Sequence, residues 1–475
     1  MVIPIRTKIV ATIGPACESK EMLVRLIDAG MKVARINLSH GPLKENKAKF
    51  TRIRKTLPTT PILMDLEGPR VRIGEMTKPV ELLEGDQIIL TTDEILGTRS
   101  RVSVSLKTLP GVVTKDQRIY VNDGIVELRV DTIEGNDVHT TVITGGSISS
   151  RKGVNIPGTE LGTTVPTQQD LEHLRFIAKL GADYVALSAV KRSSEVEAVR
   201  EFLRGEGVDI PIVSKIEHSL AVDNFNEILE ASNVIMVARG DLGVEVPPEQ
   251  VPLLQKSIIR KCNRVGKPVI VATQMLESMV QDSRPTRAET SDVANAILDG
   301  ADALMLSAET AVGKHPIEAV HVMEKIGRYV EGSYPRKRVD HYQSGQHEIA
   351  EELGEAVVTI EEHLDIGTIL VVTQAGYTSR MVSKFRPQAR IVSITPHLRV
   401  LRQLKLLWGV ECLLMDPVEN TDQMLKEAVE RVIEEKIVKP EERIIVVSGS
   451  VLSPGKTNIL GVFTVRDILQ SRVPT

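Results

Sequence analysis

The sequence predicts an α/β protein: a (β/α)8 TIM barrel with an inserted all-β lid domain and a C-terminal α/β domain. Eight short runs of apolar, β-favouring residues recur along the chain, each followed by a polar turn and a segment of helical period. A stretch of alternating strands interrupts the series after the third run, and further strand-like runs follow a polar segment near residue 335. Runs that are apolar on both faces are typical of a parallel sheet covered by helices.

The barrel is predicted from the eight runs and the helices between them. The runs occupy residues 8–14, 33–39, 61–67, 182–190, 211–217, 233–239, 268–274 and 301–308. Apolar residues at helical spacing predict helices over 21–29 and from Pro248 to Val265, the second beginning at a favourable proline. Gly30 and Gly266 stand where these helices should end.

Domain boundaries follow from changes in pattern. Residues 70–157 alternate apolar and polar residues between EGD, NDG and EGND turns, which predicts a small β domain. An insertion at the carboxyl end of a barrel strand lies over the face where barrel active sites are built, so we expect a lid; a structural decoration is the alternative. The barrel then spans 1–69 and 158–335, and a regulatory or oligomerisation domain spans 345–475, after a linker-like segment over 332–345.

Composition excludes several classes of protein. Apolar residues make up 42% and charged residues 26%, so disordered and fibrous classes are excluded. Fifty-nine basic against 63 acidic side chains give a net charge of −4, which predicts neither nucleic-acid nor membrane partners. Cys17, Cys262 and Cys412 are far apart, and the N-terminus runs directly into a strand pattern. We therefore expect a cytoplasmic protein that binds small molecules and copies of itself.

Polar residues at the ends of barrel strands predict the position of an active site, because a barrel interior favours Val and Ile. They are Arg35, Asn37, Ser39 and His40 at the end of the second run, Asp65 and Glu67 at the end of the third, Lys215 and Glu217 at the end of the fifth, Arg239, Gly240 and Asp241 at the end of the sixth, Thr273 and Gln274 at the end of the seventh, and Ser307 and Glu309 at the end of the eighth. A single residue of this kind is usually a surface residue. Six strand ends on one rim indicate a site.

These residue types favour phosphoryl transfer. Glu217 and Asp241 are hard oxygen ligands suited to Mg²⁺ or Mn²⁺. Arg35, Arg72 and Lys215 supply the positive charge that a transferring phosphoryl group needs. A turn over 239–243 is expected to expose backbone N–H groups to a carboxylate. Residues 449–457 resemble a Walker A loop but have one residue too many and precede a strand.

Taken in order, several motifs resemble those of the pyruvate kinase family over essentially the whole chain. They are TKIVATIGPA, ARINLSHG, RKGVNIPG, SKIE, MVARGDLGVE, ATQMLESM, RPTRAE and DGADALMLSAETAVG. The resemblance implies transfer of a phosphoryl group from phosphoenolpyruvate to ADP, giving pyruvate and ATP in the last step of glycolysis. It also implies a divalent cofactor, Mg²⁺ or Mn²⁺, and a homotetramer.

The resemblance further implies roles for individual residues. Lys215 resembles the lysine that neutralises the transferring phosphoryl, and Glu217 and Asp241 resemble the metal ligands. Arg35 and Arg72 are similar to phosphate-binding arginines; Gly240, Asp241 and Thr273 to positions that hold the pyruvate moiety; Asn37, Ser39, His40, Arg72 and Lys152 to nucleotide-side positions. Thr273 and Ser307 are candidates for the proton relay, with a water chain as donor because a hydroxyl alone is too weak an acid.

Two segments depart from the family pattern. Family members that use K⁺ carry Glu where this chain has Arg70 and commonly Thr where it has Leu66, although Asn37, Ser39 and Asp65 remain. We expect Arg70 to replace the cation, so that K⁺ is not required; the alternative is that Arg70 points to solvent. The second segment only partly resembles the family's effector-phosphate loop. Its candidate ligands for a phosphorylated effector are Thr373, Thr378, Ser379, Lys456 and Thr457.

Two other functions fit parts of the pattern. A phosphoenolpyruvate-using barrel lyase would share the metal carboxylates but would need neither a lid nor Lys152 on the nucleotide side. A catalytically dead metabolite sensor would depend on the C-terminal domain and predicts the loss of Lys215, Glu217 or Asp241, all of which are present.

Overall fold

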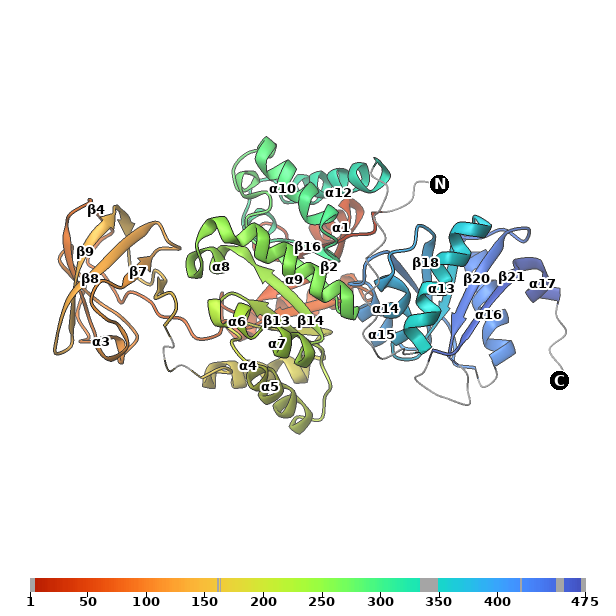
Figure 1. The fold of residues 1–475 in the computed structure, drawn as a ribbon, viewed down its shortest axis with the longest axis horizontal. Coiled ribbons are helices and arrows are strands. Elements are labelled where there is room, and N and C mark those ends of the chain that lie inside the picture. Colours follow the sequence, from red (N-terminus) through yellow and green to blue (C-terminus); the bar gives the residue numbers. More distant parts are fainter. Residues whose placement is uncertain are drawn as a thin grey trace.

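The computed structural model describes residues 5–159, 162, 164–333, 349–418, 421–449 and 457–470. Figure 1 shows a β domain on the left, a barrel in the centre and an α/β domain on the right. The chain begins in the barrel, leaves it after three strands to build the β domain, and returns to complete the barrel.

Eight parallel strands close the barrel in the order β1-β16-β15-β14-β13-β12-β3-β2. Their bounds are β1 Lys8–Thr12, β2 Met31–Asn37, β3 Ile62–Asp65, β12 Tyr184–Leu187, β13 Ile212–Ile216, β14 Val234–Ala238, β15 Val269–Ala272 and β16 Ala303–Leu306. Each lies within or overlaps one of the predicted runs, so the predicted barrel is confirmed. Side chains such as Val10, Val33 and Met236 fill the interior, and Leu406 of the C-terminal domain packs against them.

Helices surround the barrel. They are α1 Lys20–Ala29, α2 Leu43–Thr56, α4 Gln168–Leu180, α5 Ser193–Gly205, α6 Ser219–Asp223, α7 Phe225–Ala231, α8 Arg239–Glu245, η1 Pro248–Gln250, α9 Val251–Val265, η2 Glu277–Val280, α10 Arg287–Leu298, α11 Ala308–Ala311 and α12 Pro316–Ser333. The Ser19 side chain caps α1 by accepting the Met22 N–H. Gly266 ends α9 in the left-handed region at φ 68°, as its sequence position predicted. The expected turn over 239–243 is wrong, because these residues form α8.

The β domain, called the lid below, has its own apolar core. It contains β4 Val80–Leu82, β5 Gln87–Thr91, β6 Arg101–Ser103, α3 Leu109–Val112, β7 Arg118–Val121, β8 Val126–Glu134, β9 Asp137–Thr144, β10 Gly146–Ile148 and β11 Val154–Asn155. Six strands form one sheet in the order β11-β7-β8-β9-β5-β6, and β10 pairs with β4. At the first connection to the barrel, Gly68 has φ 72°, and a Cβ atom there would lie 2.8 Å from Cβ of Ser188.

The C-terminal domain is a five-stranded sheet in the order β19-β18-β17-β20-β21, in which only β21 is antiparallel to its neighbour. Its elements are α13 Ile349–Leu364, β17 Thr368–Val372, α14 Tyr377–Lys384, β18 Arg390–Thr395, α15 Leu398–Leu404, β19 Val410–Leu414, α16 Thr421–Glu434, β20 Arg443–Ser448, β21 Ile459–Thr464 and α17 Val465–Gln470. Gly332, where the linker was expected to begin, lies in α12, and 334–345 lie outside the described residues. Among the described helices, none combines the length and apolar character needed to cross a membrane.

Candidate active site

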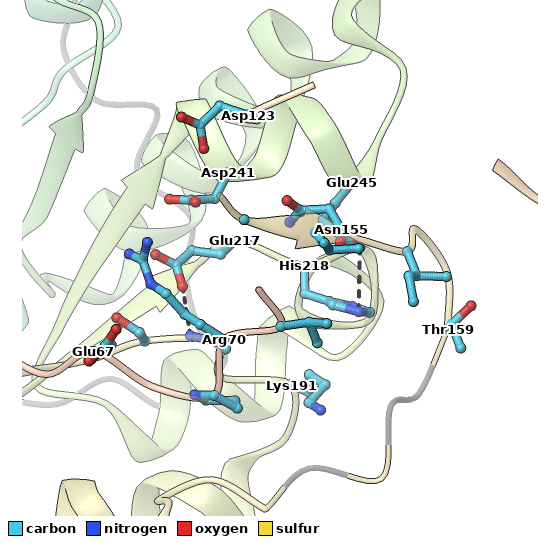
Figure 2. A pocket seen from close by; sticks show the side chains of 17 residues that line it. Glu67, Arg70, Asp123, Asn155, Thr159, Lys191, Glu217, His218, Asp241 and Glu245 are labelled. Carbon is cyan, nitrogen blue, oxygen red and sulfur yellow. Dashed lines mark hydrogen bonds and ion pairs between the residues drawn. The ribbon is translucent and has the colours of Figure 1, made fainter. Parts of the chain in front are cut away.

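The carboxyl ends of β13 and β14 open into a cleft that the lid covers from one side. Its walls come from the lid connection around Arg70, from the lid itself at Asp123 and Asn155, and from the barrel at Glu217 and Asp241. Figure 2 shows these side chains around one space. The cleft therefore lies between the ends of the barrel strands on one side and the inserted lid on the other.

Arg35, Asp65 and Lys215 form a buried charge cluster below this cleft. Nε of Arg35 donates to Oδ2 of Asp65 at 2.7 Å, and Nη1 of Arg35 donates to Oγ1 of Thr12 at 2.9 Å. Nζ of Lys215 lies 3.6 Å from Oδ1 of Asp65 and donates to Oγ of Ser188 at 2.8 Å. One carboxylate thus holds both cations in place at the ends of three strands.

Lys215 remains a cation in this environment. Its side chain is 9% exposed, and burial alone would lower its pKa. Asp65, Glu217 and Asp241 outweigh burial, so that the pKa of Lys215 is raised. For Asp65, burial works toward a higher pKa, but Lys215 and Arg35 outweigh it and the pKa is lowered. The cluster therefore keeps a protonated ammonium group at the rim.

Glu217 and Asp241, the carboxylates that the sequence singles out as metal ligands, both line the cleft. Oε1 of Glu217 lies 2.6 Å from Nζ of Lys215, and Oε2 accepts the Ala189 N–H at 2.7 Å. Burial raises the pKa of Glu217, and the charge of Asp241 adds to the effect. A cation between these two groups would relieve that repulsion. Within the described residues no group of three or more His, Cys, Asp or Glu side chains could hold a metal ion.

Thr273 and Ser307 stand on two loops that a single buried carboxylate connects. Thr273 has φ 69°; its Oγ1 accepts the Gly240 N–H at 2.7 Å and donates to the Ala272 carbonyl at 2.6 Å. Glu309 accepts the Ser307 N–H at 2.7 Å and, through its other oxygen, the Leu276 N–H at 3.2 Å. The Gly240 N–H thus fixes the side chain of Thr273, and Glu309 ties the loop that follows it to Ser307.

The residues expected on the nucleotide side lie around the lid connection. Arg72 pairs with Glu67 at 2.6 Å and donates to the Arg151 carbonyl at 3.2 Å. Oδ1 of Asn37 accepts the Ser39 N–H at 3.1 Å. Partial burial, with the charges of Arg70 and Arg35, lowers the pKa of His40. Lys152 is half-buried in the lid.

Comparison with known proteins identifies the family to which the chain belongs. A model of the pyruvate kinase barrel domain matches residues 5–320, and a model of the pyruvate kinase alpha/beta domain matches residues 351–463. The chain is 42% identical over 474 residues to the pyruvate kinase of Bacillus licheniformis, covering 98% of this chain and 81% of the relative. It is 41% identical over 475 residues to that of Geobacillus stearothermophilus, with the same coverage. The chain belongs to the pyruvate kinase family.

Membership of the pyruvate kinase family makes the chain an enzyme, a phosphotransferase with pyruvate kinase function. The family needs a divalent metal ion, and acidic side chains line the cleft, Glu217 and Asp241 among them. The lid, barrel and C-terminal domain correspond to the parts expected of a pyruvate kinase.

Arg70, the main departure from the family's K⁺-using pattern, lines the active-site cleft. The side chain is exposed, and Figure 2 shows it beside Glu217 and Glu67. Its charge contributes to the lowered pKa values of Asp65 and His40, so it lies within electrostatic range of both. Leu66, at the other departing position, is buried.

In the C-terminal domain, two of the candidate effector ligands of this pyruvate kinase-family chain lie together. Oγ1 of Thr378 is 2.7 Å from Oγ1 of Thr457. Oγ1 of Thr373 accepts the Gly376 N–H at 2.9 Å, and Oγ of Ser379 accepts from Ser393 at 2.7 Å. Lys456 lies outside the described residues.

Several residues that position the pyruvate kinase site were missed from the sequence. Ser188 and Thr12 hold Lys215 and Arg35. Both stand at strand ends, so the signal that identified the other six strand ends could have found them. Glu245 lines the cleft from α8, and its contact with the lid has no local sequence signal.

Proposed function

We propose that Lys215 and a Mg²⁺ or Mn²⁺ ion held by Glu217 and Asp241 carry the transfer of the phosphoryl group from phosphoenolpyruvate to ADP. The observation behind this assignment is the Lys215 ammonium group, kept charged by three carboxylates at the cleft under the lid. Phosphoryl transfer depends mainly on positioned charge, which this cluster supplies.

Only two acidic side chains would bind the metal ion. Mg²⁺ commonly keeps several water or substrate oxygens beside one or two carboxylates, so Glu217 and Asp241 suffice as protein ligands. When bound, the ion supplies charge neutralisation on the substrate phosphate.

The remaining roles follow the positions of the side chains. Arg35 and Arg72 would bind the phosphate group. Gly240, Asp241 and Thr273 would hold the pyruvate moiety, and Thr273 and Ser307 would pass a proton to the enolate through water. ADP would lie toward Asn37, Ser39, His40, Arg72 and Lys152.

We also propose that the enzyme does not require K⁺. Arg70 contributes a positive charge near Asp65, which lies opposite Asn37 in the barrel; Ser39 and Leu66 are the other residues of the expected cation site. A guanidinium group there supplies charge that a monovalent cation would otherwise bring, and it repels such a cation at short range.

For the rest of the molecule, we propose a cytoplasmic homotetramer with a phosphorylated effector bound in the C-terminal domain. The effector site would use Thr373, Thr378, Ser379, Thr457 and Lys456. The pair formed by Thr378 and Thr457 supports this site. The cytoplasmic location is supported by the three free cysteines within the described residues.

A coupled assay for pyruvate tests the main assignment. Pyruvate should form from phosphoenolpyruvate only with both ADP and Mg²⁺ or Mn²⁺ present. Consumption of phosphoenolpyruvate without ADP would favour the lyase, and no turnover in any mixture would favour the sensor.

A further inference from the structure

Helix α8 contacts the lid at two places. A Cβ atom on Gly124, in the turn between β7 and β8, would lie 3.5 Å from Cγ2 of Val244. At the end of α8, the Glu245 carboxylate lies next to the side chain of Asn155 in β11 and close to the backbone of Gly158, and both Glu245 and Asn155 line the cleft. Figure 1 places α8 on the side of the barrel that faces the lid, and Figure 2 shows Glu245 beside Asn155. The lid therefore rests on the carboxyl end of this helix.

The other end of the same helix carries residues of the active site. Gly240 and Asp241 lie in the first turn of α8, and Glu245 follows Asp241 by about one turn. The Gly240 N–H bonds to Oγ1 of Thr273, which anchors the helix to the loop after β15. Contacts between the lid and Glu245 therefore fix the position of the lid relative to Gly240 and Asp241 at the other end of α8.

The carboxyl group of Glu245 is buried, which is unfavourable unless the residue has a structural or functional role. Its side chain is 8% exposed, and its Oε2 is buried with no hydrogen-bond partner among the described residues, 3.4 Å from Nε2 of His218. Nδ1 of His218 accepts the Leu220 N–H at 3.1 Å, so a neutral ring carries its proton on Nε2, toward the carboxylate. Burying a carboxyl group in this way lowers the stability of the fold.

Burial and two nearby charged groups, Asp241 and Lys191, determine the pKa of Glu245. Burial raises the pKa of Glu245 to about 7; the contacts to Gly158 and Asn155 and the charge of Lys191 oppose this rise, whereas Asp241 adds to it. Near neutral pH a large share of the carboxyl is therefore protonated. An amide in the same place should keep the contacts with the lid.

We propose that Glu245 is a positioning residue that fastens the lid to the barrel through Asn155. Lys152 is three residues before Asn155 and directly precedes Gly153, which lines the cleft. The consequence for ADP rests on the proposed nucleotide role of the lid, whereas the fastening itself rests on the contacts alone.

The test uses the full-length enzyme with four single variants and one double variant. Glu245→Ala and Asn155→Ala should each raise the KM for ADP about five- to tenfold, which is the effect of losing one uncharged polar contact. The double variant should be no worse than the stronger single variant. Glu245→Gln should behave as the wild type, and so should Glu249→Ala, a matched control at an exposed carboxylate in η1.

A second measurement reports lid position without catalysis. Hydrogen exchange of the segment 153–158 in the substrate-free enzyme should be faster in Glu245→Ala and Asn155→Ala than in the wild type. If exchange increases while the KM for ADP stays constant, the fastening stands and the nucleotide role of the lid is wrong.

Three results would overturn the proposal. One is unchanged exchange in a folded Glu245→Ala variant. The second is multiplication of the single effects in the double variant. The third is a loss of Mn²⁺ affinity in Glu245→Ala with no effect of Asn155→Ala, because Glu245 would then act through Asp241 alone. If Glu245→Ala does not fold, the same two measurements on Asn155→Ala test the proposal, because this variant removes the lid residue of the contact.

Discussion

Arg35 and Asp65 form a 2.7 Å ion pair at the ends of two adjacent barrel strands. Asp65 is 1% exposed, and its second oxygen lies 3.6 Å from Nζ of Lys215. The carboxylate therefore sets the distance between a buried arginine and a buried lysine at these strand ends. Removal of either cation would leave part of the Asp65 charge uncompensated in a buried place.

Lys215→Met should lower kcat by about a thousandfold or more, because no other ammonium group takes its place on β13. Arg35 still pairs with Asp65 in this variant, so we expect it to fold. Steady-state assays with a thermal melt check both statements. Lys179→Met, at an exposed lysine in α4, is the matched control. Near-normal turnover in folded Lys215→Met would remove the assigned role.

Glu217→Gln and Asp241→Asn should each weaken Mn²⁺ binding, since each removes one of the two acidic groups that face the proposed ion. A loss of about tenfold or more corresponds to one charged ligand. Titration followed by electron paramagnetic resonance measures the affinity without turnover. Glu249→Gln should bind Mn²⁺ as the wild type does, and unchanged affinity in both cleft variants would contradict the metal assignment.

Activity should be the same in K⁺ and in a large organic cation at equal ionic strength, because Arg70 already supplies the charge. In Arg70→Glu the positive charge near Asp65 is replaced by a negative one, and a dependence on K⁺ should appear only if the remaining side chains can bind the ion. Leu66 offers no side-chain oxygen, so little dependence is expected. A several-fold activation of the wild type by K⁺ would refute K⁺ independence.

A phosphorylated metabolite should shift the saturation curve for phosphoenolpyruvate if the C-terminal loop binds an effector. A coupling of about 1–3 kcal/mol corresponds to a shift of about five- to 150-fold. Thr378→Val and Lys456→Ala should abolish the shift and leave the curve without effector unchanged. A sugar phosphate and a nucleoside monophosphate are the first compounds to screen. A shift that survives in both variants places the effector elsewhere.

The buried ammonium group of Lys8 makes folding stability depend on pH. Burial, with the charge of Lys32, lowers the pKa of Lys8 from 10.5 to about 8. Between these values the unfolded chain binds more protons than the native chain, so the free energy of unfolding rises with pH across this window. Below about pH 8 Lys8 is protonated in the native state as well, and the full free-energy cost of burying its charge lowers the stability.

Lys8→Met should remove this rise. At pH 7 it relieves roughly 3 kcal/mol of unfavourable burial and loses about 1 kcal/mol from the bond between Nζ and the Val410 carbonyl. Chemical denaturation from pH 7 to 10 measures both effects, with exposed Lys20→Met as the control. Parallel curves for Lys8→Met and the wild type would show that Lys8 is not responsible.

The sequence predicted the barrel well because its strands are apolar on both faces and polar only where they end. The same contrast located Arg35, Asp65, Lys215, Glu217 and Asp241. It failed at α8, where two glycines disfavour a helix. Arg239 stabilises that segment through Asp292, at 2.7 Å, and through the Thr273 carbonyl, at 2.9 Å.

The sequence did not predict a role for Glu245, because its surroundings come from segments that are far apart in the chain. Glu245 meets Asn155 only because the lid folds back over the barrel, and neither residue carries a periodic signal. The charges that keep Lys215 protonated likewise come from three different strand ends. These environments depend on how whole elements pack together, so they cannot be predicted from local sequence patterns.

The insertion of the lid between β3 and β12 also dictates an order of assembly. These two strands pair side by side in the barrel, with Tyr184 opposite Leu63. On the ribosome, β1 to β3 emerge first, and the free edge of β3 must wait for the entire lid to be synthesised. The lid has its own core and can fold in the meantime. Barrel closure is therefore a late event, and a nascent chain that stops before Tyr184 presents an unpaired parallel edge to chaperones.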